Sequence, residues 1–230
     1  MKAEQQFAAS DFLIENANDH HKKYAERIAE MLEESARARG IGIARRSAEY
    51  IAKKMQEGKA IIAFHKPSGQ LAGFTYIETW THDKYVANSG LIVQPEFRGS
   101  NLGKRLKHAS FALSRKKYPD ARIFSITTSH AVMKMNTELG FSPVPFSELT
   151  TDKEFWDGCQ SCRNYDILMR NDRKMCLCTG LMFDPEEKKK AFQKKMMRNK
   201  LVAVLTSVIT LRRQRLSNGK LTVKPAMKKL

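Results

Sequence analysis

One segment of the chain reads Leu91-Ile92-Val93-Gln94-Pro95-Glu96-Phe97-Arg98-Gly99-Ser100-Asn101-Leu102-Gly103-Lys104-Arg105-Leu106. An apolar run ends at a proline, an Arg-Gly turn follows, and a basic amphipathic segment then begins. Gly99 and Gly103 leave room for a phosphate group to approach the backbone, while Lys104 and Arg105 add positive charge. Because a helix start offers unpaired N–H groups and the positive end of its dipole, the segment predicts a strand–turn–helix with an anion site. A strand–turn–helix without a ligand is the alternative.

The same segment resembles the acyl-CoA signature of the GNAT N-acetyltransferase superfamily, Val-x-Pro-x-x-Arg-Gly-x-Gly-x-Gly/Ala. Five positions match, and Asn101 stands where glycine is usual; Asn tolerates a left-handed backbone, so the turn can survive the change. The resemblance implies that acetyl-CoA or another short acyl-CoA binds as co-substrate, and that the backbone N–H of Val93 meets the thioester oxygen. The implied acyl-CoA-binding residues are Leu91, Ile92, Val93, Arg98, Gly99, Ser100, Asn101, Leu102, Gly103 and Lys104.

Charge divides the 230 residues into two parts. The net charge is +17, but residues 186–230 hold 14 Lys/Arg against two acidic residues, a net +12 that leaves +5 for the first 185. Apolar content of 42% and charged content of 28% are ordinary for a globular protein. We therefore predict a mildly basic body, residues 1–185, and a basic helical tail, residues 186–230.

The chain shows no signal for secretion or membrane insertion. The first residues lead into no apolar signal region. The longest apolar-rich run, from Leu201 to Leu211, is interrupted by hydroxyl residues and falls short of the roughly 20 residues that span a bilayer. A soluble, cytoplasmic protein is expected.

Several roles fit the tail. Leu201, Val204, Leu205, Val208 and Leu211 form an amphipathic stripe that is followed by arginines. Such a segment could bind RNA, contact an anionic membrane, or form a homodimer helix. A helix docked on the body, with a disordered basic end, is favoured, because no aromatic residues interleave with the basic ones as they do in single-strand binders.

Hydrophobic periodicity predicts an α/β sandwich, and the resemblance implies the same order of elements, with a GNAT-type mixed, mostly antiparallel sheet flanked by helices. Asp19 is expected to cap a first helix that Gly40 and Gly42 end, and Ser47 to cap a second. The expected strands are 11–16, 59–65, 70–80, 85–93, 121–127, 141–146, 164–170 and 174–183, and the expected helices are 19–39, 47–58, 101–117 and 130–139.

Leu139-Gly140-Phe141 resembles a second superfamily landmark, where a helix ends in Leu-Gly-Phe. Family members often carry a tyrosine four residues before that glycine, proposed to protonate the departing CoA thiolate, and here the position is Asn136. An amide can hydrogen-bond to a thiolate but cannot protonate it, so water or His130 would have to do so.

Three residues are candidates for the general base that deprotonates the acceptor amine: Glu78, His82 and His130. Glu78 alternates with Phe74, Tyr76 and Trp80 along one strand face, and burial against aromatic rings would suit a proton acceptor. A solvent-facing glutamate is the alternative. His130 begins the helix of the second landmark and could instead be a capping residue, and His82 lies in a polar loop.

All four cysteines fall within residues 159–178, as Cys159-x2-Cys162 and Cys176-x-Cys178. The first pair lies on a polar loop, and the second would point to one face of a strand, so the four could complete a structural Zn²⁺ site. Small buried apolar side chains are the alternative.

Two classes of function follow. The resemblance implies an N-acyltransferase that acts on a small amine. The stretch from Phe155 to Leu168, with Cys176-Leu177-Cys178-Thr179, looks like a bacterial branch associated with glutamate N-acylation in arginine biosynthesis. A mildly basic body suits a dicarboxylate acceptor and a polyanionic co-substrate, whether acetyl- or succinyl-CoA. The alternatives are a protein N-acetyltransferase, or a catalytically weak acyl-CoA sensor whose tail binds nucleic acid.

Overall fold

The computed structural model describes residues 7–39 and 45–218. It contains two compact units, one extending to Pro185 and one beginning at Glu186, and each is described by itself. The first unit is a mixed α/β body, and the second consists of the helix α7 (Pro185–Asn218).

A seven-stranded sheet forms the centre of the body. Its order is β1-β2-β3-β4-β5-β7-β6, and every neighbouring pair is antiparallel except β4 and β5. The strands are β1 (Phe12–Asn16), β2 (Ala60–His65), β3 (Gln70–Trp80), β4 (Tyr85–Val93), β5 (Arg122–Thr127), β6 (Ser142–Val144) and β7 (Thr179–Phe183).

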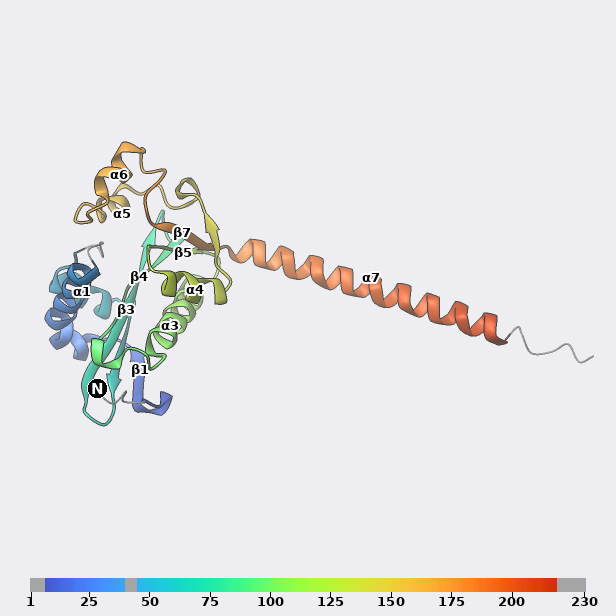
Figure 1. Ribbon diagram of the computed structural model, residues 1–230, viewed down its shortest axis with the longest axis horizontal. Helices are drawn as coiled ribbons and strands as arrows, with labels where there is room; N and C mark the ends of the chain where they lie inside the picture. Colours follow the sequence, from blue (N-terminus) through green and yellow to red (C-terminus); the bar gives the residue numbers. More distant parts are fainter. Residues whose placement is uncertain (1–6, 40–44, 219–230) are drawn as a thin grey trace, which may run out of the picture. The chain divides into compact units, whose positions relative to one another are not determined.

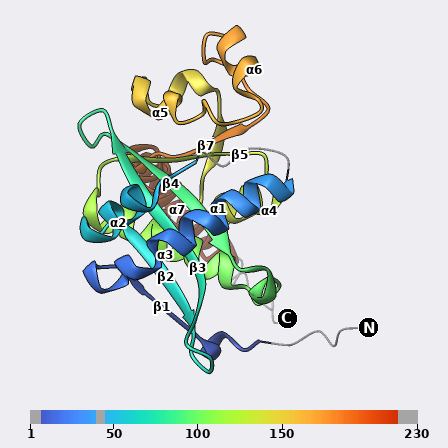
Figure 2. The same cartoon turned by 90° about the vertical axis from the view of Figure 1, so that its left-hand side faces the viewer.

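Helices cover both faces of the sheet (Figures 1 and 2). One face packs against α3 (Leu102–Lys117) and α4 (His130–Glu138) through a core that includes Leu106 and Ile123. On the other face, α1 (Ala25–Arg39) and α2 (Ala48–Gln56) cover β2 to β4. Beside them, α5 (Lys153–Asp157) and α6 (Tyr165–Arg170) cover β5 and β7. The short 3-10 helices are η1 (Ala9–Asp11), η2 (Asp19–Tyr24), η3 (Pro95–Phe97) and η4 (Phe146–Glu148).

A bulge in β4 opens the sheet. The register of β4 against β3 shifts between Tyr76 and Phe74, where Gly90 adopts φ +62°. A Cβ atom on Gly90 would lie 2.2 Å from Cε1 of Tyr76, so only glycine fits this backbone and this contact. Pairing between β4 and β5 ends at Ala87 and Phe124. Beyond that point the two parallel strands diverge and leave a gap in the sheet.

Most of the predicted elements are present, and local chemistry explains where they begin. The hydroxyl of Ser47 accepts the backbone N–H of Tyr50 at 3.2 Å, as expected of a helix cap. The predicted cap Asp19 is wrong, because the side chain of Asn18 accepts instead, from the N–H of His20. Residues 19–24 form a 3-10 helix before α1 begins. Gly40 and Gly42, the expected helix stops, lie outside the described residues.

Two predicted strands need correction. Residues 164–170 form the helix α6 rather than a strand, and β7 starts at Thr179 rather than at Lys174. Cys176 and Cys178 therefore lie in the irregular segment before β7. This segment follows a tight turn in which Asp172 and Arg173 both have positive φ, and an alternating sequence pattern does not predict such a turn.

The helix α7 covers residues 186–218 of the predicted basic tail, and residues 219–230 lie outside the described residues. Within residues 7–39 and 45–218, no helix combines the length and apolar character needed to cross a bilayer. The roles considered for the tail stay predictions.

Candidate functional site

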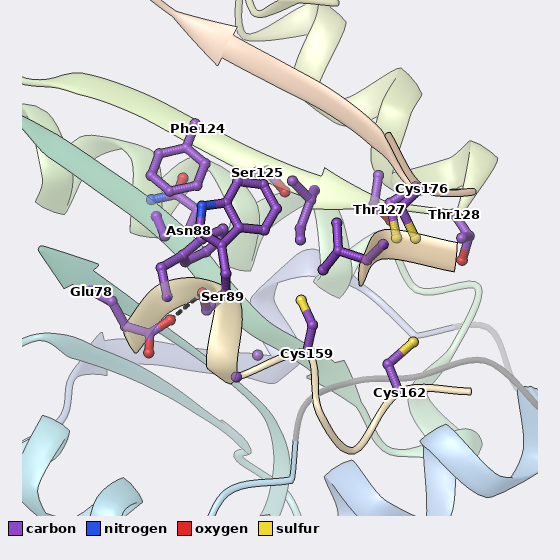
Figure 3. Close-up of a pocket in the computed structure, with 18 of the residues that line it drawn as sticks. Glu78, Asn88, Ser89, Phe124, Ser125, Thr127, Thr128, Cys159, Cys162 and Cys176 are labelled. Atoms are coloured by element: carbon purple, nitrogen blue, oxygen red, sulfur yellow. Dashed lines mark hydrogen bonds between the residues drawn. The ribbon is translucent and has the colours of Figure 1, made fainter. Parts of the chain in front are cut away.

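A cavity of about 190 Å³ lies at the gap between β4 and β5 (Figure 3). It sits on the sheet face that α2 and the α5–α6 segment cover, and it has two chemically different ends. Arg46, Tyr76, Glu78 and Ser89 form a polar end. The opposite wall is aromatic and sulfur-rich; it includes Phe124, Phe146, Phe155, Trp156, Cys159, Cys162, Cys176 and Cys178.

Glu78 is the centre of the polar end. Its side chain is only 3% exposed, which excludes the solvent-facing alternative. The hydroxyl of Ser89 donates to Oε2 at 2.6 Å, and the hydroxyl of Tyr50 makes a short hydrogen bond to Oε1. Arg46 completes the set with an ion pair at 3.4 Å. The carboxylate is therefore held by three donors, and not by aromatic packing alone as the sequence suggested.

The neighbouring phenols stay protonated. Burial, followed by the Glu78 carboxylate, raises the pKa of Tyr50 and of Tyr76 well above the ordinary value for tyrosine. Both rings therefore act as hydrogen-bond donors or acceptors and not as anions. The hydroxyl of Tyr76 accepts Nε of Arg46 at 3.0 Å, which fixes the guanidinium beside Glu78.

Phe155 and Trp156 of the aromatic wall belong to α5, and side-chain contacts tie the segment that contains α5 and α6 to the sheet. The indole N–H of the buried Trp156 donates to the carbonyl of Thr150 at 2.8 Å. Thr81, in the turn after β3, hydrogen-bonds to Thr150 and Asp152. These contacts hold an otherwise loop-rich segment over β5 and β7.

The four cysteines share the cavity wall but do not form the predicted zinc site. No three His, Cys, Asp or Glu side chains in the described part of the chain are arranged to hold a metal ion. Two of the thiols bond to one backbone instead: the N–H of Asn164 donates to Cys162 Sγ at 3.4 Å, and Cys176 Sγ donates to the Asn164 carbonyl at 3.8 Å. Figure 3 shows Cys176 on a separate segment from Cys159 and Cys162. Because Cys176 and Cys178 do not alternate on a strand, the geometric reason for a tetrahedral site is lost.

Burial controls the ionisation of two of these thiols. Burial first, and the neighbouring cysteines second, raise the pKa of Cys159 to about 11 and that of Cys178 to about 12. Protonated thiols are weak nucleophiles, so a covalent role in the reaction is disfavoured.

The predicted turn and helix start are present before α3, and whether they bind an anion stays a prediction. Asn101 caps the helix with φ +64° and Gly99 has φ +84°, so the backbone turns sharply. Among the described residues, the backbone N–H groups of residues 99–104 have no hydrogen-bond acceptor. A Cβ atom on Gly99 would meet no other atom within 4 Å, so the approach to this backbone is open.

Basic side chains surround this turn. Lys104 forms a 2.7 Å ion pair with Glu138 at the end of α4. Nε of Arg98 donates to the carbonyl of Val93 at 3.3 Å, and Arg105 donates to the carbonyl of Ala9 at 2.7 Å. Free N–H groups with flanking cations can bind phosphate groups.

Solved structures share this architecture. The chain matches N-acetylglutamate synthase from Neisseria gonorrhoeae, complexed with coenzyme A and N-acetylglutamate, with a TM-score of 0.54 and 20% identity over 75% of this chain and 35% of that one. It also matches Rv2747 from Mycobacterium tuberculosis, in complex with CoA (TM-score 0.53, 12% identity, 75% and 98% coverage). A third match is yncA from Salmonella typhimurium with its cofactor acetyl-CoA (TM-score 0.52, 14% identity, 76% and 94% coverage).

The chain has the GNAT fold. It spans about a third of the length of the Neisseria synthase. No protein-family model and no curated protein matches the sequence.

The other residues predicted to take part in catalysis lie outside the cavity. His130 is exposed at the first position of α4, after the cap Ser129, and does not line the cavity; His82 is exposed in the turn after β3. Asn136 is fully buried, and neither end of its side-chain amide has a hydrogen-bond partner in the described structure. Of the three predicted catalytic residues, Glu78 alone lines the cavity.

Sequence reasoning missed several residues of this site. Tyr50 comes from α2 and Arg46 from just before it, and no local pattern shows that this helix faces β3. The sequence did contain a weak indication that Lys107 is buried, because Lys107, Ser110 and Ser114 form a polar stripe beside the apolar face of α3. Of the predicted acyl-CoA-binding positions on β4, Leu91 lines the cavity, and Ile92 and Val93 do not.

Proposed function

We propose that the protein is an acyl-CoA-dependent N-acyltransferase that transfers an acetyl or succinyl group to the amine of a small substrate, within a ternary complex. One observation carries the proposal: the free N–H groups of residues 99–104 flank the strand β4 whose divergence from β5 opens the cavity. An anion site for the pyrophosphate thus lies next to a gap that can receive the acyl end of the same molecule.

The reaction joins an amine nitrogen to the thioester carbonyl carbon. The acceptor must first change from an ammonium to a free amine by losing a proton, and Glu78 is the one carboxylate among the described residues that line the cavity. Negative charge then develops on the thioester oxygen, which needs a hydrogen-bond donor. Among positions 91–93, the backbone N–H of Leu91 is the best placed donor, because Leu91 lines the cavity next to the bulge. Holding both reactants in the gap supplies much of the rate enhancement.

An α-amino acid is the acceptor class that fits the polar end. Arg46 and Glu78 lie side by side, 3.4 Å apart, and could meet the carboxylate and the ammonium of one zwitterion. Glutamate is the first candidate, because the Neisseria synthase was crystallised with N-acetylglutamate. A second carboxylate would find no further lysine or arginine among the described residues that line the cavity. This composition supports an amino acid in general more strongly than glutamate in particular.

A non-catalytic acyl-CoA sensor is the second candidate, and the buried Asn136 favours it, because no residue there can protonate the thiolate. Both candidates require acyl-CoA binding at α3, so that step is tested first.

Calorimetric titration with CoA tests the anion site. A Cβ atom on Gly103 would lie 3.7 Å from Val93 Cγ2, an ordinary contact, so Gly103→Glu adds negative charge without a clash at Cβ. We expect at least a tenfold loss of CoA affinity from this variant, which corresponds to about 1.4 kcal/mol. Ala112→Glu adds the same charge to the exposed side of α3 and should bind CoA like the wild type. Equal affinities for both variants would show that CoA does not bind at this turn.

A further inference from the structure

Lys107 is a buried charged group that the proposed reaction does not yet use. It lies in the middle of α3, where its relative exposure is 2%. Its Nζ has one side-chain partner, Oδ1 of Asn88 on β4, at 3.4 Å. It also lies 5.4 Å from the centre of the Phe141 ring.

The surroundings of Lys107 are neutral. The other end of the Asn88 amide donates to the hydroxyl of Ser114 at 2.8 Å, and that hydroxyl donates to the backbone of its own helix. The segment after α4 contributes the Phe141 ring, and α4 contributes Asn136, whose carbonyl accepts the N–H of Phe141. Glu138, the acidic residue that joins α4 to α3, pairs with Lys104.

A buried ammonium without a counter-ion destabilises a fold. Burial alone lowers the pKa of Lys107 from 10.5 to about 7, and no charged neighbour among the described residues offsets this effect. A methionine or leucine at this position would fill the same space without that cost. This free-energy cost suggests that the positive charge of Lys107 interacts with a ligand that the structure does not contain.

The position of Lys107 shows which part of a ligand it would meet. It lies one helical turn after Gly103, on the side of α3 that faces β4. Its partner Asn88 lines the cavity, just beyond the point where β4 and β5 stop pairing. An acyl-CoA bound by the turn before α3, with its acyl end in the gap, would place its sulfur near this strand position. The nearby Asn136 amide has unused hydrogen-bonding capacity in the same buried region.

We propose that Lys107, acting through Asn88, supplies the positive charge that stabilises the CoA thiolate as it leaves. This assignment rests on the proposed function and makes Lys107 a positioning and electrostatic residue. The amine nitrogen bonds to the carbonyl carbon, the carbon–sulfur bond breaks, and its electron pair stays on sulfur. Glu78 takes the ammonium proton before the attack and releases it to solvent, the proton lost as the amide forms then passes to Glu78, the thiolate is later protonated by water, and Lys107 acts in its protonated form.

The ionisation of bound CoA tests this directly and needs no acceptor. The thiolate absorbs in the far ultraviolet, so the thiol pKa of protein-bound CoA can be titrated in the wild type and in Lys107→Met. If the sulfur lies one hydrogen bond beyond Asn88, roughly 7 Å from Nζ, a protonated Lys107 would lower the thiol pKa, so losing it should raise the apparent thiol pKa by up to about one to two units. Lys116→Met removes a charge from the exposed end of the same helix and should leave the thiol pKa unchanged. Lys107→Gln, also neutral, serves if the methionine variant does not fold.

The outcomes separate the two proposals. A raised thiol pKa in Lys107→Met, with CoA still bound, supports the assignment. If CoA binds to both proteins with the same thiol pKa, Lys107 does not act on the sulfur, although the proposed function stands. If neither protein binds CoA, the proposed function fails and the assignment fails with it.

Discussion

Replacing Lys107 by methionine should stabilise the protein in a pH-dependent way. The unfolded chain binds the Lys107 proton up to about its ordinary pKa of 10.5, whereas burial lowers the folded value to about 7. The folded state therefore pays a penalty that is complete below pH 7 and disappears as the pH rises to 10.5. A difference of 3.5 pKa units, at 1.36 kcal/mol per unit, sets an upper limit of about 5 kcal/mol.

Urea denaturation across this pH range measures the effect. The free energy of unfolding of Lys107→Met minus that of the wild type should be largest below pH 7 and decline by about 1.4 kcal/mol per pH unit above it. Titrations elsewhere in the chain cancel in this difference. Lys116→Met, at an exposed position, should show no such trend. A difference that does not vary with pH, or a destabilised methionine variant, would refute the claim that Lys107 is a buried, unpaired charge.

Three further predictions concern the cavity. Gly90→Ala should lower stability by about 1–3 kcal/mol and abolish turnover, because its Cβ would overlap Tyr76. Gly69→Ala is the control, because Gly69 has a similar φ but its Cβ would meet no atom within 4 Å, so this variant measures the backbone cost alone. Equal losses of stability in thermal melts would argue against the overlap. Arg46→Met leaves Glu78 buried without its cation and should cost about 3–5 kcal/mol, partly restored by adding Glu78→Gln; no loss in urea denaturation would mean that the ion pair is unimportant. Cys159 and Cys178 should react slowly with iodoacetamide at neutral pH and faster as the pH rises towards 11 and 12, followed by mass spectrometry; rapid alkylation at neutral pH would contradict their raised pKa values.

Local chemistry made much of the fold predictable. The hydroxyl of Ser47 caps α2, as its residue type and its place before the helix predicted. The turn from Gly99 to Lys104 was also recognisable, because each residue there acts through its own backbone or charge. Such features depend on neighbours in sequence.

Features that depend on distant contacts were not predictable. Residues 164–170 have an apolar pattern suited to a strand, yet they form α6, because Leu168 packs against Trp156 and Phe124 rather than joining the sheet. The cysteine spacing suggested zinc, but the turn at Asp172 and Arg173 removes the assumed strand geometry.

In the candidate site, too, some residues could be predicted from their sequence neighbours and others depend on distant contacts. Glu78 was identified from its alternation with aromatic residues, but its three donors come from α2, from Arg46 just before that helix, and from β4, and could not be assigned from sequence. Lys107 lies on a helix rich in surface lysines, and only its contact with Asn88 on another element distinguishes it from them.

The most direct test of acyl transfer is the release of CoA thiol from acetyl-CoA and succinyl-CoA in the presence of free amino acids, glutamate included. The account predicts acceptor-dependent release that Glu78→Gln strongly reduces and that Ala112→Glu leaves intact. Tight CoA binding without release in the presence of any amino acid would contradict it, and would favour a sensor or a protein acceptor.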